Sequence, residues 1–254
     1  MKIVVLVKQV PDTWGERSLD PASGLLDRRT GEQVIDEINE RALEIALQQK
    51  DATKAEVVAL TMGPAGALDV VRKSLAMGAD SGIHILDDAL AGADHGRTSR
   101  VLAAAIARAG ADLVVAGNES TDGRGGVIPA MVAERLGLPN VTFLDTVTVD
   151  GGSVSGDRST DYGTETVSAT LPAVISITER SADPRFPSFR GILAAKKKKV
   201  ETLSIADLVT DPTGPTTVIR STVARPARQA GTKIVDTGDA GVKLAEFLAD
   251  NRLL

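Results

Sequence analysis

The chain has 254 residues, 43% of them hydrophobic, which is enough for a large α/β core and too ordinary for an intrinsically disordered protein. It has no cysteine and only two histidines, which excludes disulfide scaffolds, iron–sulfur clusters, thiol catalysis and cysteine-ligated zinc, and we expect no metal site. A net charge of −5 argues against nucleic-acid binding, and the opening MKIVVLVK is too short and too charged to be a signal peptide or to insert into a membrane. The composition therefore predicts a soluble, cytoplasmic protein.

Apolar runs and helical spacing alternate along the first half of the chain. The runs predict strands at residues 3–7, 57–61, 82–86, 112–116 and 141–144, and the spacing predicts helices at residues 37–49, 65–77, 98–109 and 127–136. Asp36 is placed to cap the first helix and Gly78 to end the second. Because such alternation makes right-handed βαβ crossovers, we expect an α/β fold with a doubly wound, mostly parallel five-stranded sheet.

The pattern changes after Asp145. Polar and apolar residues alternate at residues 146–149, 153–158 and 164–169, which predicts an antiparallel hairpin extension, and an apolar strand follows at residues 173–177. Beyond residue 206 the chain is rich in Thr, Pro and Arg, and only residues 239–250 have helical spacing. We therefore expect an α/β domain at residues 1–206 and an extended C-terminal arm at residues 207–254. The pattern alone fits an arm that grips a partner subunit and a helix that folds back on its own sheet equally well.

The stretch from Val114 to Pro139 predicts a buried strand, a glycine-rich loop and the start of a helix. Gly123, Gly125 and Gly126 permit positive φ and a close approach to backbone N–H groups, as phosphate binding requires. The loops after the first, second and fourth predicted strands should meet at the carboxyl edge of the sheet, where an adenine nucleotide fits. Neither a P-loop nor a G-x-G-x-x-G motif is present, and the same glycines also fit a tight turn without a ligand.

Several polar residues have both a structural and a functional interpretation. Glu119 and Asp122 fit an acid/base pair or magnesium ligands, but capping a helix or closing a turn is the commoner role of such loop residues. We expect His84, inside a strand, to be structural, and His95, in a Gly/Asp loop, to be solvated. The four lysines at residues 196–199 fit a solvated helix end better than a site for an acidic partner or a lipid.

Five segments together resemble the β subunit of electron transfer flavoproteins. In chain order they are MKIVVLVKQVPDT, SLAMGAD, AGNESTDG, GDRSTDYGTETVSATLPAVIS and PRFPSFRGILAAKKKK. Tyr162 departs from the family pattern, in which a Gly or an acidic residue is usual. The resemblance implies an adenine nucleotide alpha hydrolase-like, Rossmann-like fold and a heterodimer with an α subunit, which carries most of the FAD contacts. It also implies that this chain binds AMP structurally and acts as an electron carrier subunit, not as an enzyme.

The resemblance also implies which residues contact the AMP. They lie at the ends of two strands, at the start of the first helix and in the glycine-rich loop, where Arg124 is placed to bear on the phosphate. The full set is Leu6, Asp36, Glu37, Ile38, Asn39, Met62, Gly117, Asn118, Glu119, Ser120, Thr121, Asp122, Gly123, Arg124, Gly125, Gly126, Val127 and Ile128. It includes no catalytic residue and no metal ligand.

Residues 184–193 correspond to the family's recognition loop, which docks onto acyl-CoA dehydrogenases of fatty acid beta-oxidation. Electrons would pass to the FAD and on to a membrane quinone oxidoreductase. From the residues alone, Phe186 and Phe189 fit an exposed docking anchor or a core plug equally well, and Phe189 stands where the family commonly has Leu. Thr13 stands where some members place a Tyr near the flavin. The docking residues expected from the resemblance are Pro184, Arg185, Phe186, Phe189 and Ile192.

Two other functions stay open. One is the β subunit of an electron-bifurcating flavoprotein, with a second FAD in place of the AMP. The other is a stand-alone adenine-nucleotide-binding stress or signalling protein, which would form a homodimer without an α subunit.

Overall fold

The computed structural model describes residues 1–28, 31–209, 214–223 and 225–253. These residues fall into two compact units, residues 1–221 and residues 222–254, and each is described by itself.

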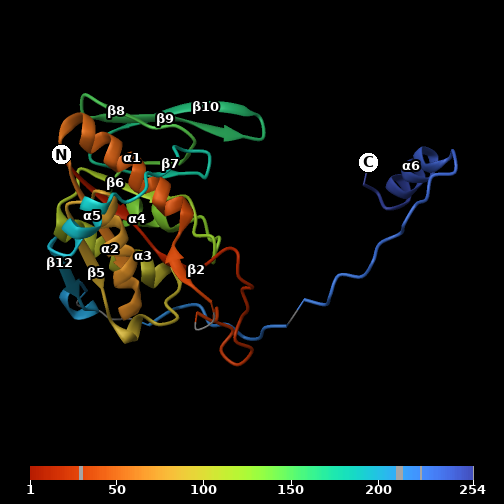
Figure 1. Ribbon diagram of the computed structural model, residues 1–254, viewed down its shortest axis with the longest axis horizontal. Coiled ribbons are helices and arrows are strands. Elements are labelled where there is room, and N and C mark those ends of the chain that lie inside the picture. The colour runs from red at the N-terminus through yellow and green to blue at the C-terminus, as the bar shows by residue number, and fades with distance from the viewer. Residues whose placement is uncertain (29–30, 210–213, 224, 254) are drawn as a thin grey trace. The chain divides into compact units, whose positions relative to one another are not determined.

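Seven parallel strands form the central sheet of the first unit, in the order β12-β5-β4-β1-β6-β11-β7 (Figure 1). The chain adds β4 and then β5 on one side of β1 and returns to place β6 on the other side, so the strand order reverses between β1 and β6. The predicted doubly wound, mostly parallel sheet is confirmed, with two more strands than the five expected. The strands are β1 (Lys2–Leu6), β4 (Glu56–Met62), β5 (Ser81–Ile85), β6 (Leu113–Gly117), β7 (Asn140–Leu144), β11 (Ala173–Ile177) and β12 (Val200–Leu203).

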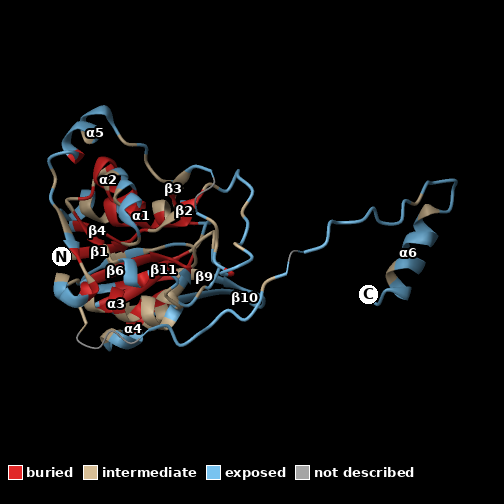
Figure 2. Ribbon diagram, turned by 90° about the horizontal axis from the view of Figure 1, so that it is seen from below, coloured by how far each residue is buried: buried red, intermediate tan, exposed pale blue. Residues whose placement is uncertain are grey.

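Helices cover both faces of this sheet, and the buried residues lie between the layers (Figure 2). One face packs on α1 (Glu37–Thr53), α2 (Leu68–Met77) and α5 (Phe189–Ala195), and the other on α3 (His95–Ala109) and α4 (Ile128–Leu136). Successive residues of β1 point to opposite faces, so Ile3 joins the first cluster and Val4 the second. Both faces are therefore apolar, which explains why the central strands read as unbroken aliphatic runs.

Several smaller elements surround the sheet. A separate antiparallel sheet contains β8 (Thr148–Asp150), β9 (Ser153–Thr160) and β10 (Gly163–Thr170), which confirms the predicted hairpin extension. A two-stranded ribbon joins β2 (Gln9–Pro11) to β3 (Gln33–Ile35), and short 3₁₀ turns are formed at η1 (Ala65–Ala67), η2 (Asp88–Leu90) and η3 (Ile205–Asp207).

Charged side chains form hydrogen bonds that connect the start of α3 and the end of α2 to segments distant in the sequence. Asp94 caps α3 by accepting from Arg97 N at 2.8 Å, and its other oxygen accepts from Thr216 N at 2.7 Å and Thr217 N at 3.0 Å. The lysine run follows the end of α5, and Lys198 turns back toward α2. Its Nζ donates to the carbonyl oxygens of Leu75 at 3.0 Å and Ala79 at 2.5 Å. These carbonyls at the end of α2 are thereby satisfied by a cation, as the helix dipole favours.

Strand β7 contains a bulge where it pairs with β11. Val141 lies opposite Ile175 and Leu144 opposite Ile177, so two residues of β7 oppose one of β11. The second of them, Phe143, has a φ of 61°, a left-handed conformation that costs about 1–2 kcal/mol for a residue with a side chain. The bulge therefore holds a large aromatic residue in a strained conformation.

The second unit contains the helix α6 (Ala240–Asp250), which confirms the helix expected at residues 239–250. Its apolar residues Val242, Leu244 and Phe247 are exposed. The division at residues 206 and 207, with an arm that packs on a partner, stays a prediction. Across both units, the helices that the structure describes include none that is long and apolar enough to span a bilayer.

Candidate functional site

In doubly wound sheets, ligands bind beyond the carboxyl ends of the strands at the point where the strand order reverses, and here that point lies between β1 and β6. Strand β1 leads into Lys8, and β6 ends at Gly117, where the glycine-rich loop begins. Gly117 is required by packing against α1, because a Cβ there would lie 2.6 Å from Asn39 Nδ2 and 3.0 Å from Ile38 Cγ2. The loop therefore starts directly against the first turn of α1, and two of the segments expected to share a ligand meet.

Asp36 joins the start of α1 to the middle of the loop. Its side chain is fully buried, and Oδ1 accepts from Ile38 N at 3.0 Å and Asn39 N at 3.3 Å. The other oxygen, Oδ2, accepts from Thr121 N at 2.7 Å. The predicted helix cap is confirmed, and the same carboxylate also fixes the loop, so its own oxygens are engaged by the protein.

Asp122 is held by two cations from the segment between β1 and β3, one on each side of β2. Its side chain is 1% exposed, and its oxygens lie 2.9 Å from Lys8 Nζ and 2.5 Å from an Arg28 terminal nitrogen. Burial alone would raise the pKa of this carboxyl, but the charge of Lys8 and hydrogen bonds from Lys8, Ser120 and Arg28 lower the pKa to about 2. A carboxylate with so low a pKa is a poor proton acceptor at neutral pH, so Asp122 is suited to hold the loop and not to act as a general base.

Asp122 therefore has a structural role, as expected, but it does not act as the cap of the following helix. It pairs with Lys8 and Arg28 instead, and the helix after the loop, α4, begins at the N-cap residue Val127, for which no side-chain cap is found within the described part of the chain. The first N–H groups of α4 are consequently left to another acceptor.

Arg17 makes a second link between the two loops. One terminal nitrogen donates to the Thr121 carbonyl at 2.5 Å, and the other donates to the Pro11 carbonyl at 2.5 Å and to Thr121 Oγ1 at 3.1 Å. The sequence pattern predicts neither this contact nor the pairing of Lys8 and Arg28 with Asp122, because the partners are 94 to 114 residues apart. The sole local signal is the presence of basic residues in a Gly- and Pro-rich loop after the first strand.

Several buried polar atoms have no hydrogen-bond partner among the described residues, and two of them belong to residues at the ends of the strands next to β1. These two are Oγ1 of Thr61, in β4, and Oδ1 of Asn118, directly after β6. Thr61 is 1% exposed and Asn118 8% exposed. Leaving such an atom unpaired costs about 1–3 kcal/mol. Strands β4 and β6 are the two neighbours of β1 in the sheet, so both atoms belong to residues at the carboxyl ends of strands next to β1.

Two aromatic side chains lie at the far end of the loop. A Cβ at Gly125 would be 2.6 Å from His95 Nε2, and a Cβ at Gly126 would be 3.7 Å from Phe143 Cζ. His95 is exposed, as expected, but it begins α3 instead of lying in a loop. His84 is buried in β5, and its Nε2 lies 3.0 Å from the Gly63 carbonyl oxygen, so its predicted structural role is confirmed.

The structure brings most of the expected AMP-contact residues to one edge. Leu6 is the last residue of β1 and is buried, whereas Met62, the last residue of β4, packs against the cluster under α3 and α4. Arg124 is exposed and has a φ of 48°, which its N–H stabilises by donating to the Ser120 carbonyl at 2.8 Å. The remaining members lie in the same two segments: Glu37 at the start of α1, and Glu119, Gly123 and Ile128 in the loop and at the start of α4.

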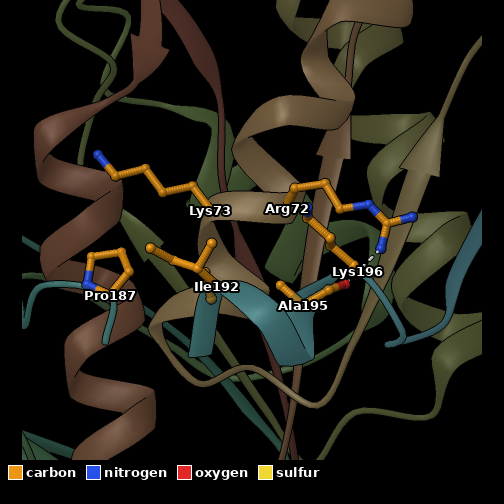
Figure 3. A pocket seen from close by; sticks show the side chains of 7 residues that line it. Arg72, Lys73, Pro187, Ile192, Ala195 and Lys196 are labelled. Carbon is orange, nitrogen blue, oxygen red and sulfur yellow. Dashed lines mark hydrogen bonds between the residues drawn. The ribbon is translucent and has the colours of Figure 1, made fainter. Parts of the chain in front are cut away.

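Residues 184–193 form a separate candidate site on the face covered by α1 and α2. Phe186 is 94% exposed and Phe189 77% exposed, so neither fills the core of this chain. Gly191 allows α5 to pack closely on α2, because a Cβ there would lie 2.2 Å from the Ala76 carbonyl oxygen. Between the two helices is an open pocket of about 530 Å³ (Figure 3). It is lined by Arg72, Lys73, Ala76, Pro187, Ile192, Ala195 and Lys196.

Comparison with known proteins agrees with this arrangement. The family model described as "Electron transfer flavoprotein domain" matches residues 24–208. The electron transfer flavoprotein subunit beta of Mycobacterium leprae is 48% identical, with 99% of each chain covered. That of Megasphaera elsdenii is 33% identical over 91% of this chain and 90% of its own length. The caffeyl-CoA reductase-Etf complex subunit CarD of Acetobacterium woodii is 34% identical, with 93% of each chain covered. The chain therefore belongs to the electron transfer flavoprotein family, as a beta subunit.

Proposed function

We propose that this β subunit holds AMP in the crevice between β1 and β6 as a structural ligand and docks acyl-CoA dehydrogenases through residues 184–193. Electrons would then pass to FAD held mainly by the α subunit and on to a membrane quinone oxidoreductase. The observation that carries the AMP assignment is the pair of unpartnered buried atoms, Thr61 Oγ1 and Asn118 Oδ1.

The chemistry of these atoms fits a nucleoside. An amide oxygen such as Asn118 Oδ1 can only accept, so it suits the amino group of adenine or a ribose hydroxyl, and the hydroxyl of Thr61 can donate or accept. Lys8 and Arg28 are engaged by Asp122, so the phosphate would depend on backbone N–H groups of the loop and on the first turn of α4. Arg124 is the exposed cation of the loop and is proposed to approach the phosphate. AMP itself supplies no redox chemistry, which agrees with a carrier subunit that is not an enzyme.

Docking is proposed for residues 184–193 because of their exposed apolar side chains. Fully burying a Phe side chain contributes about 1.5–3 kcal/mol, so Phe186 and Phe189 would together suffice for a transient complex. The exposed apolar residues of α6 support the proposal that the C-terminal arm packs on the α subunit.

The docking proposal is tested with Phe189→Ala in the purified heterodimer. We expect the concentration of carrier that half-saturates an acyl-CoA dehydrogenase to rise about tenfold, because about 1.4 kcal/mol of apolar burial is lost. Tyr162→Ala is the control, since Tyr162 is a fully exposed aromatic residue at the turn between β9 and β10, away from the docking residues. If the half-saturating concentration of carrier is unchanged in Phe189→Ala, the docking assignment is wrong.

A bifurcating function is the second candidate, since the similar CarD is named as a subunit of a caffeyl-CoA reductase-Etf complex. The two candidates differ in nucleotide content. Acid release from the purified heterodimer should yield AMP and one FAD per dimer, whereas two FAD per dimer and no AMP would establish the bifurcating type. Purification as a homodimer without a flavin-bearing chain would instead support the stand-alone nucleotide-binding protein.

A further inference from the structure

The docking segment, residues 184–193, and the residues just before it are held on α1 by two charged side chains that lie one helical turn apart. Arg41 donates to the Ser181 carbonyl at 2.8 Å and pairs with Asp183 at 2.8 Å. Glu44, three residues further along α1, accepts from both the backbone and the side chain of Arg185. Because residues i and i+3 lie on the same side of a helix, α1 holds the whole entry to the docking segment from one side.

The contact of Glu44 with Arg185 is bidentate and largely buried. Arg185 Nε lies 2.7 Å from Glu44 Oε2, one of its terminal nitrogens lies 2.9 Å from Oε1, and Arg185 N lies 3.1 Å from Oε2. Glu44 is 5% exposed, whereas the second carboxylate near this guanidinium, Asp51, has a side chain that is 65% exposed. Burial raises the pKa of Glu44, and the hydrogen bonds and charge of Arg185 outweigh it, so the net pKa lies below the ordinary value. Three hydrogen bonds to one buried carboxylate thus fix both the backbone and the side chain at residue 185.

The other end of the segment is fixed as well. Ser188 Oγ accepts from Gly191 N at 3.0 Å and so begins α5, and Arg72 donates to the Ala195 carbonyl at 2.9 Å (Figure 3). Phe186 and Phe189 lie between these two attachments. Surface loops are ordinarily the most mobile parts of a fold, and ordering a mobile loop on binding weakens the complex. Phe186 and Phe189 are therefore exposed apolar side chains on a segment whose two ends are held in place.

We propose that Glu44 is a positioning residue for docking. Through Arg185 it holds residues 184–193 on α1, so that Phe186 and Phe189 are presented in one arrangement before a dehydrogenase arrives. Arg185 thereby acts inward, on this chain, and not as a direct contact with the partner. This inference rests on the docking function proposed above and adds the element that sets its affinity.

The test compares Glu44→Gln with Asp51→Asn in the FAD-loaded heterodimer. Dehydrogenase-linked flavin reduction is measured as a function of carrier concentration, with an acyl-CoA dehydrogenase and its acyl-CoA substrate as the electron source. Glu44→Gln keeps the shape but loses the charge, and we expect KM for the carrier to rise about five- to tenfold with kcat within about twofold, since the cost is that of ordering a few side chains. Asp51→Asn removes only the exposed partner, and its KM should stay within about twofold. Arg185→Lys, which keeps the charge but cannot make the two-pronged contact, should resemble Glu44→Gln.

Hydrogen exchange of the amides of residues 185–192 reports the positioning directly, and it should be faster in Glu44→Gln than in Asp51→Asn. Faster exchange with an unchanged KM would overturn the inference, and so would a fall in kcat with loss of FAD, which would show a role in assembly instead. Phe189→Ala, measured alongside, separates a failure of the positioning role from a failure of docking itself. If it raises KM and Glu44→Gln does not, docking stands and the positioning role fails. If neither changes KM, docking through this segment is wrong.

Discussion

Replacing Asp122 by Asn tests whether the two cations from the segment between β1 and β3 hold the glycine-rich loop in place. The substitution keeps the shape of the side chain and removes the charge that Lys8 and Arg28 pair with. The pKa of Asp122 falls from the ordinary 3.8 to about 2, and at about 1.4 kcal/mol for each unit of pKa this corresponds to about 2.5 kcal/mol of folding stability. In a domain of this size, that loss lowers Tm by about 5–10 °C.

The dependence on pH has a definite sign. A carboxyl whose pKa is lower in the folded state stabilises the fold at pH values above its unfolded pKa, and this stabilisation is lost as the pH falls from about 4 toward 2. The difference in Tm between the wild type and Asp122→Asn should therefore be the same at pH 7 and pH 5 and should shrink below pH 4. Thermal unfolding of the heterodimer, followed by calorimetry at one scan rate, measures both quantities.

Glu201→Gln is the control, because Glu201 forms an ion pair with Arg108 at 3.0 Å whose side chains are 37% and 54% exposed. Exposed pairs of this kind contribute about 0–1 kcal/mol. If Asp122→Asn loses no more Tm than Glu201→Gln at pH 7, or if its deficit grows as the pH falls, the assignment of Asp122 as the residue that holds the loop is refuted.

Three further substitutions probe backbone positions. Gly117→Ala would place a Cβ 2.6 Å from Asn39 Nδ2, so we expect a loss of about 1–3 kcal/mol in unfolding free energy, together with weaker AMP retention after gel filtration. Gly191→Ala would meet the Ala76 carbonyl oxygen at 2.2 Å and displace α5, which should raise KM for dehydrogenases while bound AMP is retained. The unfolding free energy of Phe143→Gly, measured by denaturant unfolding, should be about 1 kcal/mol higher than that of Phe143→Ala. Both variants lose the ring, and Gly alone adopts a φ of 61° without strain.

The central strands could be predicted from the sequence because burial on both faces leaves an unbroken apolar run. Strands β1, β4 and β6 have such runs and were expected nearly at their observed bounds. The run of β11 also predicts a strand, but its insertion between β6 and β7 depends on long-range pairing that leaves no local trace. Strand β12 was not expected, because its four residues alternate and follow a lysine run.

The candidate site was predictable only in part, for a similar reason. Glycines and an apolar strand mark the loop at residues 117–126 locally. Ion pairs such as those of Asp122 join residues about a hundred positions apart, and the sequence around Lys8 or Arg28 does not indicate which residue is the partner. The unpaired state of Thr61 Oγ1 is equally invisible in the sequence, since a Thr at the end of a buried strand ordinarily finds a partner.

The contact between Lys198 and the end of α2 makes four adjacent lysines chemically unequal. Lys196, Lys197 and Lys199 are exposed, whereas the ammonium of Lys198 is bound to two backbone carbonyls, and burial lowers its pKa. An amine-selective reagent would therefore modify three of these side chains quickly and Lys198 slowly, at the rate at which its hydrogen bonds break. That slow rate would measure how often the side chain of Lys198 leaves these two carbonyls in the folded protein.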